Sequence, residues 1–222
     1  ILKTRYYDDY EEYIKFQSTK TLDPEKRKKW LGPEWRQKID GFKAEFSKLG
    51  NFLTKEKKCL CIGARTGQEV VALKELGVVD VVGIDIVEHL PYVKKGDMHN
   101  LEFENESFDF VYSNILDHSI YPEKLFAEVE RVLRNDGIFY LQIQFDLDQD
   151  KYTEYIIKNP FYDVVQLSKK SFCVGMAQFP RNFAGMNFEF LFQKDKKLSK
   201  LYDKYGDIKD VVVPDAYGKI WD

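Results

Sequence analysis

Residues 58–77 read KCLCIGARTGQEVVALKELG and combine the pattern of a strand with that of a helix. The apolar run 59–62 has the length of a buried strand and ends at Gly63, after which apolar residues recur at helical spacing up to Gly77. A strand that enters a helix through a glycine turn aims the first N–H groups of the helix at the space above the strand's carboxyl end. We therefore expect a ligand site at this turn.

Length and composition favour one globular domain that works on small molecules. The chain has 222 residues, of which 44% are hydrophobic and 15% aromatic, enough for a full α/β core and too many for a disordered chain. A formal net charge of -3 gives no electrostatic support for binding nucleic acid or an anionic membrane. We expect no membrane span, because no apolar run is long enough to cross a bilayer.

The three cysteines, Cys59, Cys61 and Cys173, predict buried reduced thiols in a cytoplasmic protein. They cannot all pair, and two of them lie on one predicted strand, so neither a disulfide framework nor a zinc spacing is present. The sequence begins with Ile1 rather than Met, which favours a piece of a longer, multidomain chain. Nothing in the sequence predicts the oligomeric state.

Residues 1–50 have the pattern of an aromatic, charged helical segment. Asp23-Pro24-Glu25 is a helix start, and Gly32-Pro33 separates this helix from a further helical pattern. Two interpretations stay open: the helices cover one side of a sheet, or they form a lid over the ligand.

Residues 80–86 predict a second buried strand with Asp85 at its end. Asp85 follows Gly63 by 22 residues, which is where nucleotide-binding folds place a carboxylate that accepts hydrogen bonds from both ribose hydroxyls. Only residues 87–92 separate Asp85 from the next candidate strand, 93–95, and these are too few for a crossover helix.

The chain alternates strands and helices as far as residue 150. Residues 108–112 predict a central strand that ends at Ser113-Asn114, a helix starts at Pro122, and a turn at 135–137 leads into a strand over 138–145. This alternation is typical of a mostly parallel sheet with helices on both faces, and ligands of such sheets bind at the carboxyl ends of the strands.

After residue 150 the pattern changes. We expect a weak helix over 152–157 and strands over 162–167, 172–178 and 187–193, which finish the sheet as an antiparallel hairpin. The loop 179–186 carries glycine and proline, and we expect it to overhang the ligand site. Residues 195–222 predict a lysine-rich helix and a tail.

Five motifs in order resemble the class I S-adenosylmethionine-dependent methyltransferases, in particular the methyltransferase type 11 group. They are CIGARTG from Cys61, GID at 83–85, GDMHNLEF from Gly96, FDFVYSNILDH from Phe108 and EVERVLRNDGIFYL from Glu128. The resemblance covers residues 55–145 and implies an α/β, Rossmann-like fold: a seven-stranded, mostly parallel sheet with an antiparallel terminal hairpin strand, helices on both faces and an N-terminal helical preamble. Within one domain we expect a helical cap or lid (1–50), a cofactor-binding core (51–195) and a C-terminal helix and tail (196–222).

The resemblance also implies S-adenosyl-L-methionine as cofactor and S-adenosyl-L-homocysteine as product. Carried over by position, Gly63, Ala64, Arg65 and Gly67 hold the methionine portion, Asp85 holds the ribose, Asp97, Met98 and Ile86 meet the adenine, and Ser113 and Asn114 lie under the sulfonium. Two alternatives stay open: Asp97 caps the following turn, and Ile86 belongs to the ordinary core.

Two residues depart from the family pattern. The family usually has an acidic residue where this chain has Cys61, and a middle glycine where it has Arg65. The contact to the cofactor's amino group must then come from a backbone carbonyl or from elsewhere. The guanidinium of Arg65 either pairs with the cofactor carboxylate or projects into solvent.

Asp117 and His118 are the candidate catalytic bases, one helical turn after Ser113-Asn114. Methyl transfer to a hydroxyl requires positioning of the acceptor and removal of a proton. His118 matches a histidine frequent in the family motif, and an adjacent carboxylate raises the basicity of a histidine. The alternative for each is a structural hydrogen bond or a helix cap. We expect no metal, because the acidic and histidine residues here follow no ligand spacing.

The acceptor is predicted by resemblance alone. The motifs GAR-x-G-x-E-V, GD-x-H and SN-x-x-DH are similar to those of methyltransferases of glycan assembly. This resemblance implies O-methylation of a sugar hydroxyl. Another small-molecule or lipid acceptor stays open, as does a catalytically silent cofactor-binding module. A dehydrogenase is not favoured, because the turn lacks G-x-G-x-x-G.

Overall fold

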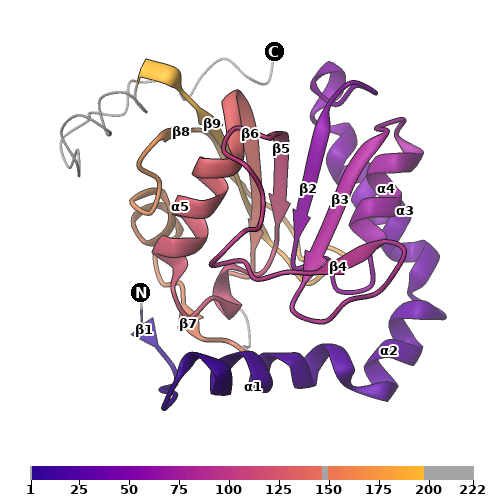
Figure 1. The fold of residues 1–222 in the computed structure, drawn as a ribbon, viewed down its shortest axis with the longest axis vertical. Coiled ribbons are helices and arrows are strands. Elements are labelled where there is room, and N and C mark those ends of the chain that lie inside the picture. The colour runs from indigo at the N-terminus through magenta and orange to yellow at the C-terminus, as the bar shows by residue number, and fades with distance from the viewer. Residues whose placement is uncertain (1, 147–149, 198–222) are drawn as a thin grey trace.

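The computed structural model describes residues 2–146 and 150–197. Seven strands form one sheet in the order β4-β3-β2-β5-β6-β9-β8 (Figure 1). β9 runs antiparallel to both of its neighbours, and the other six strands share one direction. The strands are β2 (Lys58–Ile62), β3 (Asp80–Asp85), β4 (Val93–Lys95), β5 (Phe108–Ser113), β6 (Leu133–Ile143), β8 (Ser171–Gln178) and β9 (Phe188–Lys194). The predicted Rossmann-like sheet with its antiparallel hairpin strand is confirmed.

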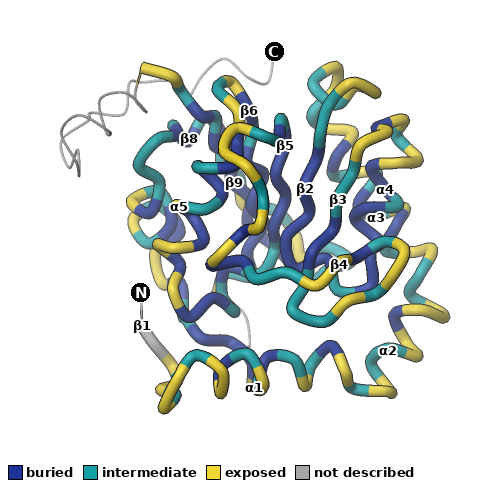
Figure 2. Tube along the Cα trace, viewed as in Figure 1, coloured by how far each residue is buried: buried dark blue, intermediate teal, exposed yellow. Residues whose placement is uncertain are grey.

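Helices cover both faces of the sheet. On β2, Cys59 and Cys61 face the core under α3 (Trp35–Ser47) and α4 (Gln68–Glu75), while Leu60 and Ile62 face the core under α5 (Pro122–Val132). The sheet is the most buried part of the molecule (Figure 2). None of the described helices has the length and apolar character of a membrane span.

The first two helices lie along the carboxyl ends of the strands (Figure 1). The Asp9 carboxylate caps α1 (Tyr10–Leu22) by accepting from the Glu12 N–H at 2.8 Å. Asp23 caps α2 (Pro24–Leu31) in the same way, with Pro24 in the first turn as predicted. α1 thus crosses the edge at which ligands of parallel sheets bind.

The turn between β2 and α4 has the backbone that its glycines predict. Gly63 and Gly67 have φ of 76° and 93°, and Arg65 lies between them at 49°. A Cβ on Gly63 would lie 2.5 Å from the Cδ1 of Ile115, so a larger residue does not fit beside the β5 loop. The predicted strand, turn and helix are therefore confirmed.

The segment after residue 150 differs from the prediction in two places. Residues 152–157 form no helix; β7 (Tyr155–Ile156) pairs instead with β1 (Leu2–Lys3), which lies about 150 residues earlier in the chain. Residues 162–167 form no strand, because the chain turns at Pro160 into the π-helical segment η3 (Phe161–Val165), whose Asp163 carboxylate accepts from two backbone N–H groups.

Two further expectations concern strand and tail boundaries. β6 starts at Leu133, directly after α5, so the predicted turn at 135–137 is an irregularity within the strand, with Asp136 at φ 64°. The predicted C-terminal helix and tail lie mostly outside the described residues, which end at 197.

Candidate active site

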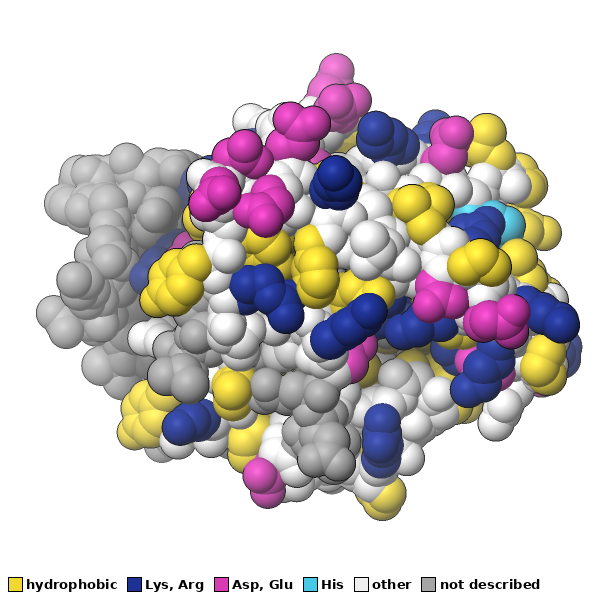
Figure 3. Space-filling model, turned by 90° about the horizontal axis from the view of Figure 1, so that it is seen from below, with side chains coloured by type: hydrophobic (Ala, Val, Ile, Leu, Met, Phe, Trp, Pro, Cys, Tyr) yellow, Lys and Arg dark blue, Asp and Glu magenta, His cyan; other side chains and the backbone are white. Residues whose placement is uncertain are grey.

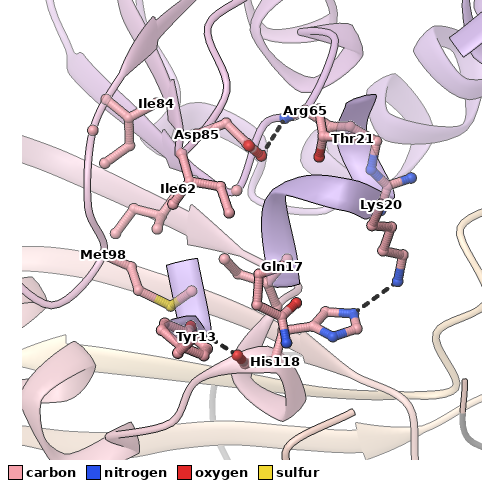
Figure 4. A pocket seen from close by; sticks show the side chains of 14 residues that line it. Tyr13, Gln17, Lys20, Thr21, Ile62, Arg65, Ile84, Asp85, Met98 and His118 are labelled. Atoms are coloured by element: carbon pink, nitrogen blue, oxygen red, sulfur yellow. Dashed lines mark hydrogen bonds between the residues drawn. The ribbon is translucent and has the colours of Figure 1, made fainter. Parts of the chain in front are cut away.

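A first cavity lies at the carboxyl ends of β2, β3 and β5, under α1 (Figure 4). It is lined by Tyr13, Gln17, Lys20 and Thr21 from α1, and by Ile62, Gly63, Arg65, Ile84, Asp85, Ile86, Gly96, Met98, Ile115 and His118 from the sheet side. α1 therefore covers this cavity, whereas α3 packs on a face of the sheet. The interpretation that the N-terminal helices cover the sheet fits α3, and a lid over a ligand stays a prediction for α1.

Asp85 presents its carboxylate to the first cavity from the end of β3. One oxygen accepts from the Arg65 N–H and the other from the Val87 N–H, both at 3.1 Å. Burial raises the pKa of Asp85, and these two N–H groups and the Arg65 guanidinium oppose that shift. Each oxygen keeps a further lone pair, so the carboxylate can accept from two neighbouring hydroxyls.

The backbone N–H groups of the turn are bonded within the protein. Gly63 and Ala64 both donate to the carbonyl oxygen of Ile84, at 2.9 and 3.0 Å, and Gly67 donates to the carbonyl of Ala64. These three N–H groups precede α4, so the expectation about the first N–H groups of that helix stays a prediction.

A second cavity adjoins the first and has a volume of about 240 Å³. It is lined by Lys20, Lys38, Phe42, Arg65, Gln68, Glu69, Asn114, Asp117, His118, Gln144, Asp150, Arg181, Ala184, Gly185 and Met186. The loop 179–186 forms part of its wall. Lys20, Arg65 and His118 line both cavities and form their shared wall. Figure 3 shows this side of the molecule, with lysine and arginine side chains across its middle.

His118 has a defined orientation in the shared wall. Its Nδ1 lies 2.9 Å from the carbonyl oxygen of Tyr152, which can only accept, so Nδ1 carries the proton. Its Nε2 lies 3.0 Å from the Nζ of Lys20, which donates to it (Figure 4). Lys20 also donates to Asp150, and burial together with the charge of Arg65 lowers the pKa of Lys20. The basic nitrogen of His118 thus faces the cavities.

The other predicted site residues are divided between the cavities and their surroundings. Asp117 and Asn114 line the second cavity, and the nearest Asp117 oxygen lies 3.9 Å from the Nε2 of His118. Ile86 and Met98 line the first cavity. Ala64, Gly67 and Ser113 are buried and line neither cavity.

Asp97 lies beside the first cavity without lining it. Its carboxylate accepts from the Tyr10 hydroxyl at 2.7 and 2.8 Å and from the His99 N–H at 2.8 Å. It therefore caps the following turn, which was one of the two interpretations of this residue. The contact of Asp97 with the adenine amino group stays a prediction. For this contact, the carboxylate would have to accept from the amino group and from the Tyr10 hydroxyl at the same time.

Glu69 is a buried carboxylate that the sequence did not single out. It lies in the first turn of α4, lines the second cavity and is 6% exposed. Burial raises its pKa to about 7, and the charges of Arg65 and Lys38 act against this shift. An acidic residue in a first helical turn is ordinary in sequence, since it complements the helix dipole, so only its burial distinguishes it.

The contact of Lys20 with His118 could not be predicted from the sequence either, because it too depends on the packed structure. The aromatic pattern of residues 1–22 indicated a covering helix, but which polar side chain of that helix meets His118 depends on how the helix docks. Among the described residues, no three histidine, cysteine or acidic side chains converge as they would around a metal ion.

Residues 60–141 match a family model described as a methyltransferase domain. The structure is similar to that of Burkholderia thailandensis 1,6-didemethyltoxoflavin-N1-methyltransferase with bound 1,6-didemethyltoxoflavin and S-adenosylhomocysteine, at 16% identity and a TM-score of 0.67 over 87% of this chain and 93% of that chain. Residues 60–141 therefore carry a methyltransferase domain, and the structure has the fold of the class I methyltransferases. Methyltransferases of this class use S-adenosylmethionine, and the paired acceptors of Asp85 and the glycine turn of this domain fit that cofactor.

Other solved structures share the fold of this methyltransferase domain. Haemonchus contortus phosphoethanolamine N-methyltransferase 1 is 17% identical, with a TM-score of 0.59 over 89% of this chain and 53% of that chain. An S-adenosylmethionine-dependent methyltransferase from Aquifex aeolicus is 18% identical, with a TM-score of 0.57 over 78% of this chain and 98% of that chain. No curated protein matches the sequence.

Proposed function

We propose that this methyltransferase methylates a sugar hydroxyl of a glycan or glycan precursor, which binds in the second cavity. The observation that carries the proposal is the wall of Lys20, Arg65 and His118 shared by the two cavities. A cofactor in the first cavity and an acceptor in the second would meet at this wall. The lining of the second cavity is mostly polar or charged, which suits a hydroxyl-rich acceptor better than a lipid.

The cofactor would lie along the edge formed by β2 and β3. Asp85 would accept from the ribose hydroxyls, and Ile86 and Met98 would pack near the adenine. S-adenosylmethionine, when bound, supplies a methyl group on a positively charged sulfur. The chain would position the acceptor and remove its proton.

His118 is our preferred base. Its Nδ1–H is fixed by the Tyr152 carbonyl, so the lone pair on Nε2 is available on the cavity side. An acceptor hydroxyl would take the place of the Lys20 ammonium on Nε2. Asp117 is the second candidate, since it lines the same cavity close to His118.

An amine or ring nitrogen is the alternative acceptor. Two enzymes of similar structure are named for N-methylation, one of 1,6-didemethyltoxoflavin and one of phosphoethanolamine. A nitrogen acceptor would use the same cavity and depend less on a base. A catalytically silent module would bind the cofactor and transfer no methyl group to any acceptor.

Transfer of labelled methyl to a panel of sugar nucleotides, oligosaccharides and amines tests the proposal. We expect labelled product from at least one sugar, and a loss of turnover of about 100-fold or more in His118→Ala. His89→Ala is the control, because His89 contacts Arg27 and lines neither cavity.

Each alternative has its own outcome in this assay. Labelled amines without labelled sugars would replace the sugar proposal with the nitrogen acceptor. Full turnover in both His118→Ala and Asp117→Ala would refute the assignment of the base. Cofactor binding without transfer across the whole panel would favour the silent module.

A further inference from the structure

Glu69 has a carboxylate oxygen that nothing in the described structure satisfies. The Oε2 atom is buried and has no hydrogen-bond partner among residues 2–146 and 150–197, while the N–H of Glu69 itself bonds the carboxylate. The side chain nevertheless lines the second cavity. A buried carboxylate without a partner is unfavourable, so this oxygen is poised to accept from a ligand.

Arg65 provides the opposite charge on the same wall. The carbon of its guanidinium lies 4.3 Å from the centre of the Trp30 ring. Among residues 2–146 and 150–197, no carboxylate or carbonyl oxygen accepts a hydrogen bond from this guanidinium. Lys38, the other cation near Glu69, is bound to Glu34 at 3.1 Å. Glu69 and Arg65 thus offer a carboxylate oxygen and a guanidinium to a ligand that carries both charges, and Arg181 is a second guanidinium in the lining of this cavity.

The position of Arg65 connects this pair to the cofactor site. Its N–H bonds Asp85, and its side chain lines both cavities. Glu69 follows four residues later, after the turn into α4. A ligand whose ribose lies at Asp85 would therefore pass Arg65 before it reaches Glu69.

We propose that Glu69 and Arg65 form the subsite for the amino-acid end of S-adenosylmethionine, Glu69 accepting from the α-ammonium and Arg65 pairing with the α-carboxylate. This inference rests on the proposed function, since it presupposes that the cofactor binds along this edge. The ammonium supplies the partner that Oε2 lacks, and the planar guanidinium matches a carboxylate through two parallel N–H groups.

Calorimetric titration with two ligands tests this subsite. S-adenosylhomocysteine carries the amino-acid end, and 5′-methylthioadenosine lacks it. We expect Glu69→Gln to weaken binding of S-adenosylhomocysteine by about 10- to 100-fold and to leave binding of 5′-methylthioadenosine unchanged. Glu75→Gln is the matched control, because Glu75 lies at the other end of α4, on the surface with Arg36.

The deaminated analogue of S-adenosylhomocysteine separates a specific contact from a general one. It should bind Glu69→Gln and the unsubstituted protein equally, because it has no ammonium. Two results with Glu69→Gln would overturn the inference alone. One is an equal loss of affinity for S-adenosylhomocysteine and 5′-methylthioadenosine, and the other is unchanged binding of S-adenosylhomocysteine. Absence of S-adenosylhomocysteine binding in the unsubstituted protein would overturn the proposed function and the inference together.

Discussion

Glu69 shows at the scale of one residue how burial changes the chemistry of a carboxyl group. Its pKa rises from 4.5 to about 7, chiefly by burial, with Asp85 adding to the rise and Arg65 and Lys38 opposing it. Because the folded-state pKa is the higher one, the protonated group stabilises the fold. That contribution is complete below pH 4.5 and is lost as the pH rises through 7.

Unfolding of the cofactor-free protein by urea at pH 5 and pH 8 measures this effect. Glutamine does not titrate, so the stabilisation that the unsubstituted protein loses between pH 5 and pH 8 is not lost in Glu69→Gln. The free energy of unfolding of Glu69→Gln should therefore rise by about 2–3 kcal/mol relative to that of the unsubstituted protein from pH 5 to pH 8. The same comparison with Glu75→Gln should show no such gain, because hydrogen bonds with Arg36 and Lys43 lower the pKa of Glu75 to about 2 and keep it ionised at both pH values. A stability difference between Glu69→Gln and the unsubstituted protein that does not change with pH would contradict the raised pKa.

The position of a site residue could be predicted from sequence where strand ends determine it. Gly63 and Asp85 lie at the ends of adjacent parallel strands, and the motif spacing predicted their meeting. The environment of Glu69, Lys20 and Asp97 could not be predicted in this way. Each depends on a partner distant in the chain, such as Tyr10 for Asp97, which only the packed structure brings together.

Among the elements, α1 is held over the first cavity by polar contacts as well as by packing. The Tyr10 hydroxyl bonds Asp97, the Tyr13 hydroxyl bonds the carbonyl of His118 at 2.9 Å, and Gln17 bonds the carbonyl of Tyr152 at 2.8 Å. These contacts lie along the helix face that covers the first cavity. α1 is therefore fixed to the loops that carry the predicted site residues.

Tyr10→Phe should loosen this helix without changing its packing surface. Loss of the hydroxyl leaves the Asp97 carboxylate short of a donor, and we expect the free energy of local opening to fall by about 1–2 kcal/mol. Hydrogen exchange of the amides in residues 10–22 should become correspondingly faster. Tyr162→Phe, at an exposed ring, is the control. Unchanged exchange over α1 in Tyr10→Phe would show that the hydroxyl does not hold the helix.

The elements that the sequence predicted correctly have strong local patterns. β2, α4 and α5 each combine an apolar pattern with a glycine or proline signal, whereas β5 has the apolar pattern alone. The packing of all four elements follows these patterns. Residues 152–167 have no such pattern. β7 exists because β1 pairs with it across the length of the chain, and this long-range pairing overrides local preference.

For the whole molecule, the sheet arranges two cavities in series along one edge. The strand ends bring Asp85 to the first cavity, the β5 loop brings His118 to the shared wall, and the loop 179–186 and α4 complete the second cavity. In the function that we propose, the cofactor would occupy the first cavity, its amino-acid end would reach Glu69 in the second, and the acceptor would meet the methyl group at the shared wall. The central claim is that S-adenosylmethionine lies along this edge, with its ribose at Asp85.

A crystal structure of the protein with S-adenosylhomocysteine tests that claim most directly. The account predicts the two ribose hydroxyls within hydrogen-bond distance of the Asp85 carboxylate, and the sulfur near the wall formed by Lys20, Arg65 and His118. A nucleoside bound elsewhere, with its ribose far from Asp85, would contradict it.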